Sequence, residues 1–366
     1  MNEELYWLWL SNISGIGRKK KDTLIECFKS PQGVFLATDQ DIKEICESFS
    51  FFRKNDLTNL LASRNIERVE AFEKKLIAAG IRFYSINHKL YPKQLKNIYD
   101  PPFVIYTKGN LLEEAQIKIA IVGARKCSTY GKKVAEYLAK RLAENNIAII
   151  SGLARGIDAA AHKGALLGSG KTVAVLGCGV NICYPEENYQ LMKQIIDTGC
   201  VLSETPVNTP PIAGNFPLRN RIISGLCDGV VIVEAAAKSG SLITADCALE
   251  QGKDVFAIPG KIFDPLSEGT NRLIKMGAKP VSDIEDILEE YIELAVKTKE
   301  NTTDITNTLN EEEKMICSCI KFEPVHLETI IRQLPMGIDA IHFLLIKLEM
   351  KGVIEQLPNK YFVKSV

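Results

Sequence analysis

The sequence has no excess of either charge sign, because 45 lysines and arginines balance 45 aspartates and glutamates. A protein that coats nucleic acid by bulk charge is basic, so any phosphate binding by this chain must come from a local patch. The chain also lacks an apolar run of the roughly 18 residues needed to span a bilayer. Residues 1–4 lack the basic segment that begins a signal peptide. We therefore expect a soluble protein without a membrane segment.

Disulfide and metal signatures are missing as well. None of the ten cysteines forms a Cys-x-x-Cys pair, and several lie in or beside apolar runs, namely Cys178, Cys200, Cys227 and Cys247. This use of cysteine is typical of a reducing cytoplasm rather than of a disulfide framework. The sequence contains no His-x-x-x-His, no His-Glu-x-x-His and no Cys/His cluster. We therefore expect neither a metal site nor a resident cofactor.

The residue pattern divides the 366 residues into three regions and one linker. Residues 1–80 are predicted to form a small helical domain that ends in a long helix over 64–79. Residues 81–296 alternate between strand and helix patterns. Residues 297–310 are polar without an apolar period, which predicts a linker. Residues 311–366 read as three helices followed by a hairpin, a pattern typical of a winged-helix domain.

The first region contains a glycine turn, Ile13 to Gly17, followed by the basic run Arg18 to Lys21. The turn resembles that of a helix-hairpin-helix unit, whose glycines let backbone N–H groups approach a DNA phosphate. A plain turn followed by solvated lysines explains the same pattern equally well. The sequence leaves both interpretations open.

The central region has the alternation of a doubly wound, mostly parallel sheet with helices on both faces, an extended Rossmann-like fold. The expected strands are Ile81 to Ile86, Phe103 to Tyr106, Lys118 to Val122, Ala148 to Ser151, Thr172 to Leu176, Val201 to Ser203, Val230 to Val233 and Asp254 to Ile258. In such a sheet, ligands bind beyond the carboxyl ends of the strands. The residues that follow each strand therefore decide the function.

Two helix starts rich in anion-binding groups flank one buried strand late in this region. Pro217 fits the first turn of a helix, which places Arg219 and Arg221 near a helix start, where the dipole disfavours cations unless an anion is nearby. Ser239 or Ser241 is the expected N-cap of the next helix, whose N–H groups can hold an oxyanion. We favour a phosphate site here over arginines that pair with carboxylates and serines that only cap.

Other expected strands end in similar groups. Glycines, hydroxyls or cations follow them in the segments Gly123 to Gly131, Ser151 to Asp158, Gly177 to Gly179 and Pro259 to Lys261. Familiar nucleotide motifs do not fit these segments. Gly168 to Thr172 resembles the end of a P-loop, but Ala165 stands where the leading glycine belongs and Lys171 precedes a strand.

Catalytic groups are sparse. Asp158 and His162 share a helix face and could form an acid–base pair, but a packed histidine oriented by a carboxylate is the interpretation we favour. A nucleotide-processing hydrolase is the alternative function for a sheet of this kind, and Glu234 is its candidate catalytic carboxylate. No matching acid–base partner is visible. The pattern favours a binding protein that is not an enzyme.

Several long blocks, in order, resemble one bacterial family. They are Gly123 to Arg125 with Ser128 and Tyr130-Gly131, Ser151 to Leu166, Thr172 to Val180 with Tyr184-Pro185, Phe216 to Leu226, Glu234 to Ala245, Phe256 to Gly260 and Ser267 to Asn271. The chain is similar over residues 80–285 to the DNA-processing protein A family, also called Smf. This resemblance implies a protein that binds single-stranded DNA and loads the RecA recombinase onto it, in support of homologous recombination and natural transformation.

The resemblance also implies a basic pocket on the central domain. Positions in matching blocks that would contact DNA are Arg125, Ser128, Gly152, Arg155, Lys171, Asn215, Phe216, Arg219, Asn220, Arg221, Ser239, Gly240 and Lys261. Lysines and arginines would hold phosphates, and Phe216 would either stack a base or pack in the core. Stacking on an aromatic ring contributes about 1 to 3 kcal/mol and tolerates any base.

Members of the family dimerise through the Rossmann-like domain, which implies a homodimer here. Ile284, Ile287 and Leu288 lie on one helix face and are candidates for that contact, although they could instead cover the sheet. In the winged-helix region, the expected third helix is mostly apolar, with only His342 and Lys347 as candidate DNA contacts. We therefore expect protein contacts or domain packing by this region and not strong binding of duplex DNA.

Overall fold

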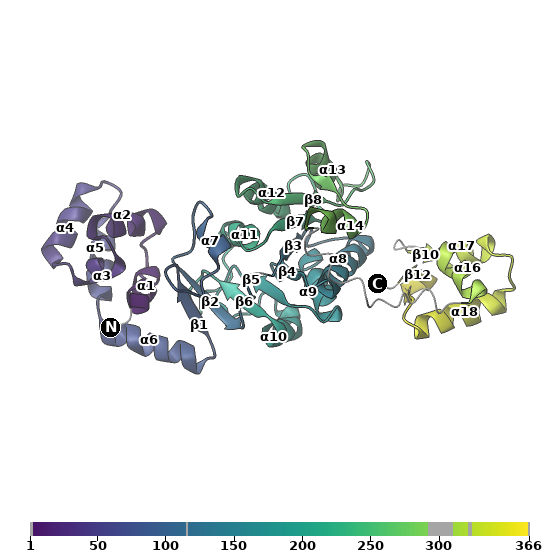
Figure 1. The fold of residues 1–366 in the computed structure, drawn as a ribbon, viewed down its shortest axis with the longest axis horizontal. Coiled ribbons are helices and arrows are strands. Elements are labelled where there is room, and N and C mark those ends of the chain that lie inside the picture. The colour runs from purple at the N-terminus through teal and green to yellow at the C-terminus, as the bar shows by residue number, and fades with distance from the viewer. Residues whose placement is uncertain (1–2, 115, 292–309, 321–323, 365–366) are drawn as a thin grey trace.

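The computed structural model describes residues 3–114, 116–291, 310–320 and 324–364. Figure 1 shows an amino-terminal group of helices, a central sheet with helices on both faces and a small carboxyl-terminal unit. The predicted linker lies outside the described residues except for Asn310, which caps the first helix of the carboxyl-terminal unit.

The amino-terminal region consists of short helices around the buried helix α1. The helices are α1 (Glu3–Ser11), α2 (Arg18–Phe28), α3 (Pro31–Leu36), α4 (Asp39–Ser48), α5 (Lys54–Ser63) and α6 (Ile66–Ala78). The predicted long helix is confirmed as α6. Helix α1 buries six consecutive residues, Leu5 to Leu10, because it packs against this region and against the sheet.

The basic run at the start of α2 is not a solvated face. The Lys20 ammonium lies 2.6 Å from the buried Asp56 carboxylate, and the Lys21 ammonium donates to the Ser11 carbonyl at 2.6 Å. Burial lowers the pKa of Lys21 to about 8. The interpretation of these lysines as solvated is therefore wrong, since two of them bond within the protein.

The amino-terminal region and the sheet share one hydrophobic core. Trp7 contacts the Phe103 ring, with centroids 5.4 Å apart, and both belong to a cluster that reaches the buried face of the sheet. The Glu4 carboxylate accepts hydrogen bonds from the Ser85 N–H and hydroxyl. These contacts cross the predicted boundary at residue 80, so the amino-terminal helices pack directly against the edge of the sheet.

The central sheet has nine strands in the order β1-β2-β6-β5-β4-β3-β7-β8-β9. They are β1 (Arg82–Ser85), β2 (Val104–Gly109), β3 (Lys118–Val122), β4 (Ala148–Ser151), β5 (Thr172–Val175), β6 (Cys200–Ser203), β7 (Gly229–Ile232), β8 (Asp254–Ala257) and β9 (Lys279–Pro280). The pairs β1–β2 and β2–β6 are antiparallel and the other pairs are parallel. The eight predicted strands and the mostly parallel sheet are confirmed. The prediction missed β9, because two residues carry no periodicity.

Helices cover both faces of the sheet, because successive strand residues point to opposite sides. Side chains of α8 (Thr129–Glu144) and α9 (Ile157–Leu167) pack with Ile119 and Ile121, and α10 (Tyr189–Thr198) covers the same face. Helices α11 (Asn215–Gly225), α12 (Gly240–Glu250) and α13 (Glu268–Lys275) pack with Ala120 and Val122 on the other face. The short α7 (Lys93–Lys96) lies on that second face too.

The candidate dimer residues lie at and around α14 (Glu285–Leu288). Ile284 is 1% exposed and Ile287 is fully buried, and both pack in the cluster that joins α8 and α9 to the sheet. Leu288 is half-buried against the same cluster. These side chains therefore cover the sheet, as the alternative interpretation expected, and Ile284 and Ile287 have little surface left for contact with a second copy.

The carboxyl-terminal unit has the predicted three helices and hairpin. It consists of α16 (Glu311–Cys319), β10 (Val325–His326), α17 (Leu327–Gln333), α18 (Ile338–Met350), β11 (Ile354–Leu357) and β12 (Tyr361–Lys364), with sheet order β10-β12-β11. The two-residue β10 was not predicted. In the described part of the chain no single helix is long and apolar enough to cross a membrane, and α17 with α18 meets that test only as a pair bent by 119°.

A buried carboxylate ties α16 to α18. The Glu313 side chain is 1% exposed and lies 2.8 Å from the Lys351 ammonium and 3.1 Å from that of Lys347. It also accepts a hydrogen bond from the Asn310 N–H at the start of α16. The hydrogen bonds from Lys351, Asn310 and Lys347 lower the pKa of Glu313 to about 2.

This carboxylate should make the carboxyl-terminal unit sensitive to acid. Because its folded pKa lies below the ordinary value of 4.5, its stabilising effect is complete above pH 4.5 and is lost as the pH falls toward 2. We expect Glu313→Gln to lower the melting temperature of this unit by several degrees at pH 6 and by much less near pH 2. Calorimetry of the full chain at both pH values measures the difference, and a constant difference would contradict the assignment.

Candidate nucleic-acid interface

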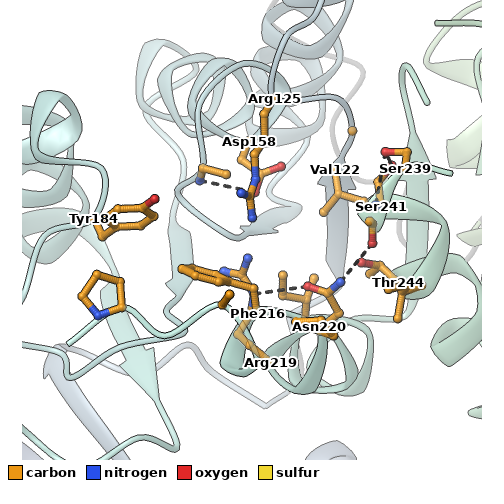
Figure 2. Close-up of a pocket in the computed structure, with 18 residues that line it drawn as sticks. Val122, Arg125, Asp158, Tyr184, Phe216, Arg219, Asn220, Ser239, Ser241 and Thr244 are labelled. Carbon is orange, nitrogen blue, oxygen red and sulfur yellow. Dashed lines mark hydrogen bonds between the residues drawn. The ribbon is translucent and has the colours of Figure 1, made fainter. Parts of the chain in front are cut away.

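A cavity of about 590 Å³ opens beyond the carboxyl ends of the central strands. Its walls come from the segments after β3 and β4, the loop around Tyr184, and the first turns of α11 and α12. Figure 2 shows Arg125 and Asp158 on one side of this cavity and Arg219 and Asn220 on the opposite side. The structure thus brings together residues that lie more than 100 positions apart in the chain.

An aromatic pair and an arginine form one rim of the cavity. The rings of Tyr184 and Phe216 are tilted with centroids 5.6 Å apart, and the Arg125 guanidinium lies 5.3 Å from the Phe216 centroid. Arg125 is exposed, Tyr184 is 40% exposed and Phe216 is half-buried. Phe216 is therefore accessible at the rim and is not a core residue. Tyr184 was not among the predicted contacts, although it lies in a block that carried the family resemblance.

The start of α12 forms the opposite rim (Figure 2). Ser239 is the N-cap, as predicted, and its hydroxyl lies 2.8 Å from that of Ser241. Gly240 is exposed, and nothing lies within 4 Å of the position that a Cβ would take. An anion can therefore approach this helix start, where the dipole and N–H groups favour negative charge.

The floor of the cavity is held by Arg219, which is 6% exposed. Its guanidinium donates to the carbonyls of Gly152, at 2.8 Å, and Val175, and to the Asn220 amide oxygen at 3.3 Å. Helix α11 begins at Asn215, so Arg219 lies in the second turn, where its side chain turns inward. Arg219 thus binds backbone at the ends of β4 and β5 and has little surface to offer a phosphate.

Asp158 is the buried counter-charge of Arg219. Burial raises the pKa of Asp158, and the Arg219 charge and backbone N–H groups at Ala154 and Gly152 oppose that rise. A Cβ on Gly152 would stand 2.5 Å from the Arg219 Nη1, so only glycine lets the arginine approach. The Gly152 N–H, which we expected to face DNA, contacts this carboxylate instead.

His162 is fully buried and does not pair with Asp158. Its Nδ1 lies 2.7 Å from the Thr172 hydroxyl, and burial together with the Arg219 charge lowers the pKa of His162 to about 3. The imidazole is therefore neutral at physiological pH. This arrangement supports a structural role for His162.

At the N-terminus of α8, Ser128 is hydrogen-bonded to Glu234. The Ser128 side chain caps the helix, and its N–H and hydroxyl both donate to the Glu234 carboxylate. A Cβ on Gly131 would stand 2.4 Å from that carboxyl group. Glu234 is 5% exposed and both of its oxygens accept hydrogen bonds from Ser128. The only carboxylate that the hydrolase alternative offered is therefore used as a helix cap.

Of the remaining predicted residues, three lie at the edge of the sheet that carries the cavity, and two cations pair with carboxylates away from it. Arg155 is exposed near the cavity and lies 3.0 Å from the Glu187 carboxylate, whereas Lys261 is exposed in the segment after β8. Asn215 starts α11.

Two other predicted cations face other partners. Arg221 pairs with Glu204 and lies 3.8 Å from the Asp100 carboxylate. Lys171 precedes β5 and pairs with Glu113 at 3.1 Å. It therefore lies at the amino edge of the sheet, away from the cavity, because in parallel strands the residues before and after each strand lie at opposite edges. Among the residues that the structure describes, no group of three His, Cys, Asp or Glu side chains could hold a metal ion.

Comparison with known proteins decides the family. Residues 82–292 match the model of DNA recombination-mediator protein A, and residues 300–360 match the DprA winged helix domain. The chain belongs to the DprA/Smf family. It is 46% identical over 223 residues to DNA processing protein DprA of Bacillus subtilis, a match that covers 60% of this chain and 75% of the relative. Protein Smf of Synechocystis is 30% identical over 98% of both chains.

Two solved DprA structures resemble the structure of this chain. DNA processing protein A from Streptococcus pneumoniae superposes with a TM-score of 0.66 at 37% identity, covering 79% of this chain and 98% of the other. The protein from Helicobacter pylori, described for its single-stranded DNA binding mode, gives a TM-score of 0.53 at 32% identity and covers 58% and 96%. The DprA fold therefore extends over the sheet that carries the cavity.

The buried position of Arg219 predicts that it serves stability. We expect Arg219→Met to lower the free energy of unfolding by about 3 to 5 kcal/mol, because it removes the hydrogen bonds to the Gly152 and Val175 carbonyls and the positive charge that offsets the burial of Asp158. Urea unfolding followed by circular dichroism measures this. Arg155→Met is the matched control, since its exposed ion pair contributes at most about 1 kcal/mol. Equal losses in the two variants would contradict the structural role.

Proposed function

We propose that this protein binds single-stranded DNA at the cavity beyond the carboxyl ends of the central strands and loads RecA onto it. The main support for this proposal is the composition of the cavity rim. The Arg125 guanidinium, the Phe216 ring and the accessible N-terminus of α12 all face one cavity. An exposed aromatic ring offers a stacking platform to an unpaired base, which a duplex keeps inside its stack. The rim thus favours single strands over duplex.

The cationic and hydrogen-bonding groups extend beyond one cavity. Arg155 and Lys261 lie in segments that follow β4 and β8, on either side of the segment that carries Arg125. Groups spread along several strand ends suit successive phosphates of a polymer better than one nucleotide. Because the whole chain is neutral, binding should depend on this local track and should weaken as salt rises.

Within this proposal, the residues of the site divide their roles. Arg125, Arg155 and Lys261 hold phosphates, Phe216 stacks a base, and Ser128 caps α8. The others complete the rim and floor, namely Gly152, Asn215, Arg219, Asn220, Ser239 and Gly240. We assign Arg221 and Lys171 no direct contact, since both pair with carboxylates away from the cavity.

The proposal places the protein in homologous recombination and natural transformation, as a cytoplasmic homodimer without catalytic activity. Its support is the match to a recombination-mediator family and the use of Glu234 as a helix cap and of Asp158 as a partner of Arg219. Glu234, the candidate carboxylate for hydrolysis, thus has a structural role at the start of α8. We do not assign the dimer contact to α14.

Substitutions at the rim should weaken DNA binding selectively. We expect Phe216→Ala to raise the Kd for an unstructured oligothymidine by roughly 5- to 150-fold, the equivalent of about 1 to 3 kcal/mol for one stacked base. Arg125→Ala should reduce the slope of log affinity against log salt by about 1. Fluorescence anisotropy at several salt concentrations measures both.

Lys171→Ala is the control for these variants, because it removes a lysine at the opposite edge of the sheet. Its affinity and salt slope should match those of the parent. If Lys171→Ala weakened binding as much as Arg125→Ala, the DNA would extend to the amino edge and the proposed track would be wrong.

Loading of RecA should depend on the same rim. On single-stranded DNA coated with single-strand-binding protein, we expect this protein to shorten the lag before RecA hydrolyses ATP, and we expect Arg125→Ala with Phe216→Ala to abolish the effect. Lys171→Ala should behave as the parent. A parent protein that binds oligothymidine but leaves the lag unchanged would refute loading while leaving DNA binding intact.

A further inference from the structure

A second cavity, of about 380 Å³, lies on the sheet face that α7 and α11 cover. We call it the amino-edge cavity. Its floor is apolar and consists of Ile150, Val173, Leu202 and Leu226. Its walls come from β1, from the segment that includes α7 and from the segment after β2. Its volume falls in the range of about 300 to 1,000 Å³ that is usual for small-molecule sites.

The cavity exists because helices leave part of this sheet face uncovered. On this face, helices α11 and α12 pack over β3, β7 and β8, whereas the helix beside the cavity is the four-residue α7 (Figure 1). A doubly wound sheet normally has both faces covered. The side chains of Val173 and Leu202 therefore line a cavity. In a fully covered sheet, a longer helix would pack on them.

A buried hydroxyl without a partner lies beneath the cavity. Thr107 is fully buried, and its Oγ1 has no hydrogen-bond partner among the residues that the structure describes. In the sheet, Thr107 stands directly opposite both Arg82 and Leu202. Directly opposite residues on neighbouring strands point to the same face, and both of these neighbours line the cavity. A buried polar group without a partner is costly, so a ligand that reaches this hydroxyl gains a hydrogen bond.

The charges around the cavity favour an anion. Each of its two lining acids already faces a lysine, since Glu113 lies 3.1 Å from Lys171 and Glu114 lies 2.8 Å from Lys93. Three further basic residues line the cavity, namely Arg82, Lys89 and Lys118.

Lys118 brings a cation to the cavity wall. Its ammonium group donates to the carbonyls of Glu114, at 3.1 Å, and Gln116, at 2.6 Å. An ammonium group has three hydrogens, so one donor remains after these two bonds. Asp228, beside Lys118, accepts hydrogen bonds from the Lys118 N–H and the Gln94 amide.

We propose that the amino-edge cavity binds a small apolar anion, an aromatic ring that carries one carboxylate or sulfonate group. The ring occupies the apolar floor beside Tyr84 and Tyr91, and the acid group is held by Arg82 and by the Thr107 hydroxyl, which stands directly opposite Arg82 in the sheet. The site lies at the edge of the sheet opposite to the DNA cavity, because Lys118 begins β3 whereas Arg125 follows it. The proposal is independent of the proposed function.

Fluorescence titration of the full-length protein with 1-anilinonaphthalene-8-sulfonate tests this site, with uncharged N-phenyl-1-naphthylamine as the comparison. We expect saturable binding of the sulfonate at one site and weaker binding of the neutral analogue. Val173→Phe or Leu202→Phe should fill the cavity and weaken sulfonate binding by at least tenfold. Using both variants protects the test if one fails to fold, and circular dichroism together with oligothymidine binding shows which are native.

Two polar variants separate the contributions to binding. Thr107→Val keeps the volume and removes the hydroxyl, so it should weaken sulfonate binding by about fivefold, which corresponds to one ordinary hydrogen bond. Lys89→Glu should weaken the sulfonate but not the neutral analogue, whereas Lys238→Glu, at the carboxyl edge, should change neither. Indole-3-carboxylate should displace the sulfonate, and oligothymidine should not. Parent-like affinity in a folded Val173→Phe or Leu202→Phe variant, or displacement by oligothymidine, would overturn the proposal.

Discussion

The buried Arg219 guanidinium is the group on which the proposed DNA cavity depends. One guanidinium from α11 reaches across the sheet edge and binds the carbonyl oxygens at Gly152 and Val175, so it fixes the ends of two neighbouring strands relative to one helix. Asp158, at the start of α9, balances its charge. A buried arginine needs such partners because leaving its charge unpaired costs several kcal/mol. The floor is therefore rigid, and the groups above it keep their spacing.

Two helix starts at this edge show how the same local geometry can be closed or open. The start of α8 is occupied by the Glu234 carboxylate, which takes the place that a ligand's anion would otherwise fill. The start of α12 is capped by Ser239 and remains accessible at Gly240. The chain thus supplies its own anion to one site and leaves the other for a phosphate. The accessible helix start at this edge is therefore that of α12 and not that of α8.

Exposure separates residues that carry function from residues that carry the fold. Arg125 and Phe216 meet at the rim, where a cation and an aromatic face are accessible together. Arg221, two residues after Arg219, points to a different cluster and pairs with Glu204 and Asp100. Because residues two apart on a helix do not share a face, the two arginines of one short segment serve separate parts of the molecule.

The sequence by itself determined the order of elements and the edge of the sheet at which the proposed site was to be sought. Short β-branched runs alternate with helical stripes, and strand period and helix capping are local properties that can be read from neighbouring residues. One of the two serines expected to cap α12, Ser239, is therefore its N-cap, and the expected third helix of the carboxyl-terminal unit is α18. The two-residue strands β9 and β10 were missed because they form only through pairing with strands that other parts of the chain supply.

Only the tertiary structure decided which charged side chains face solvent. Arg219, Lys171 and Arg125 are equally basic in the sequence, yet one is buried in the floor, one lies at the far edge and one stands at the rim. The same holds for Ile284 and Ile287, whose apolar face suits a dimer contact as well as it suits a sheet. Periodicity shows that a face is apolar but not what covers it. Burial, ion pairing and the position of Tyr184 beside Phe216 depend on contacts between distant segments, and those contacts exist only once the chain has folded.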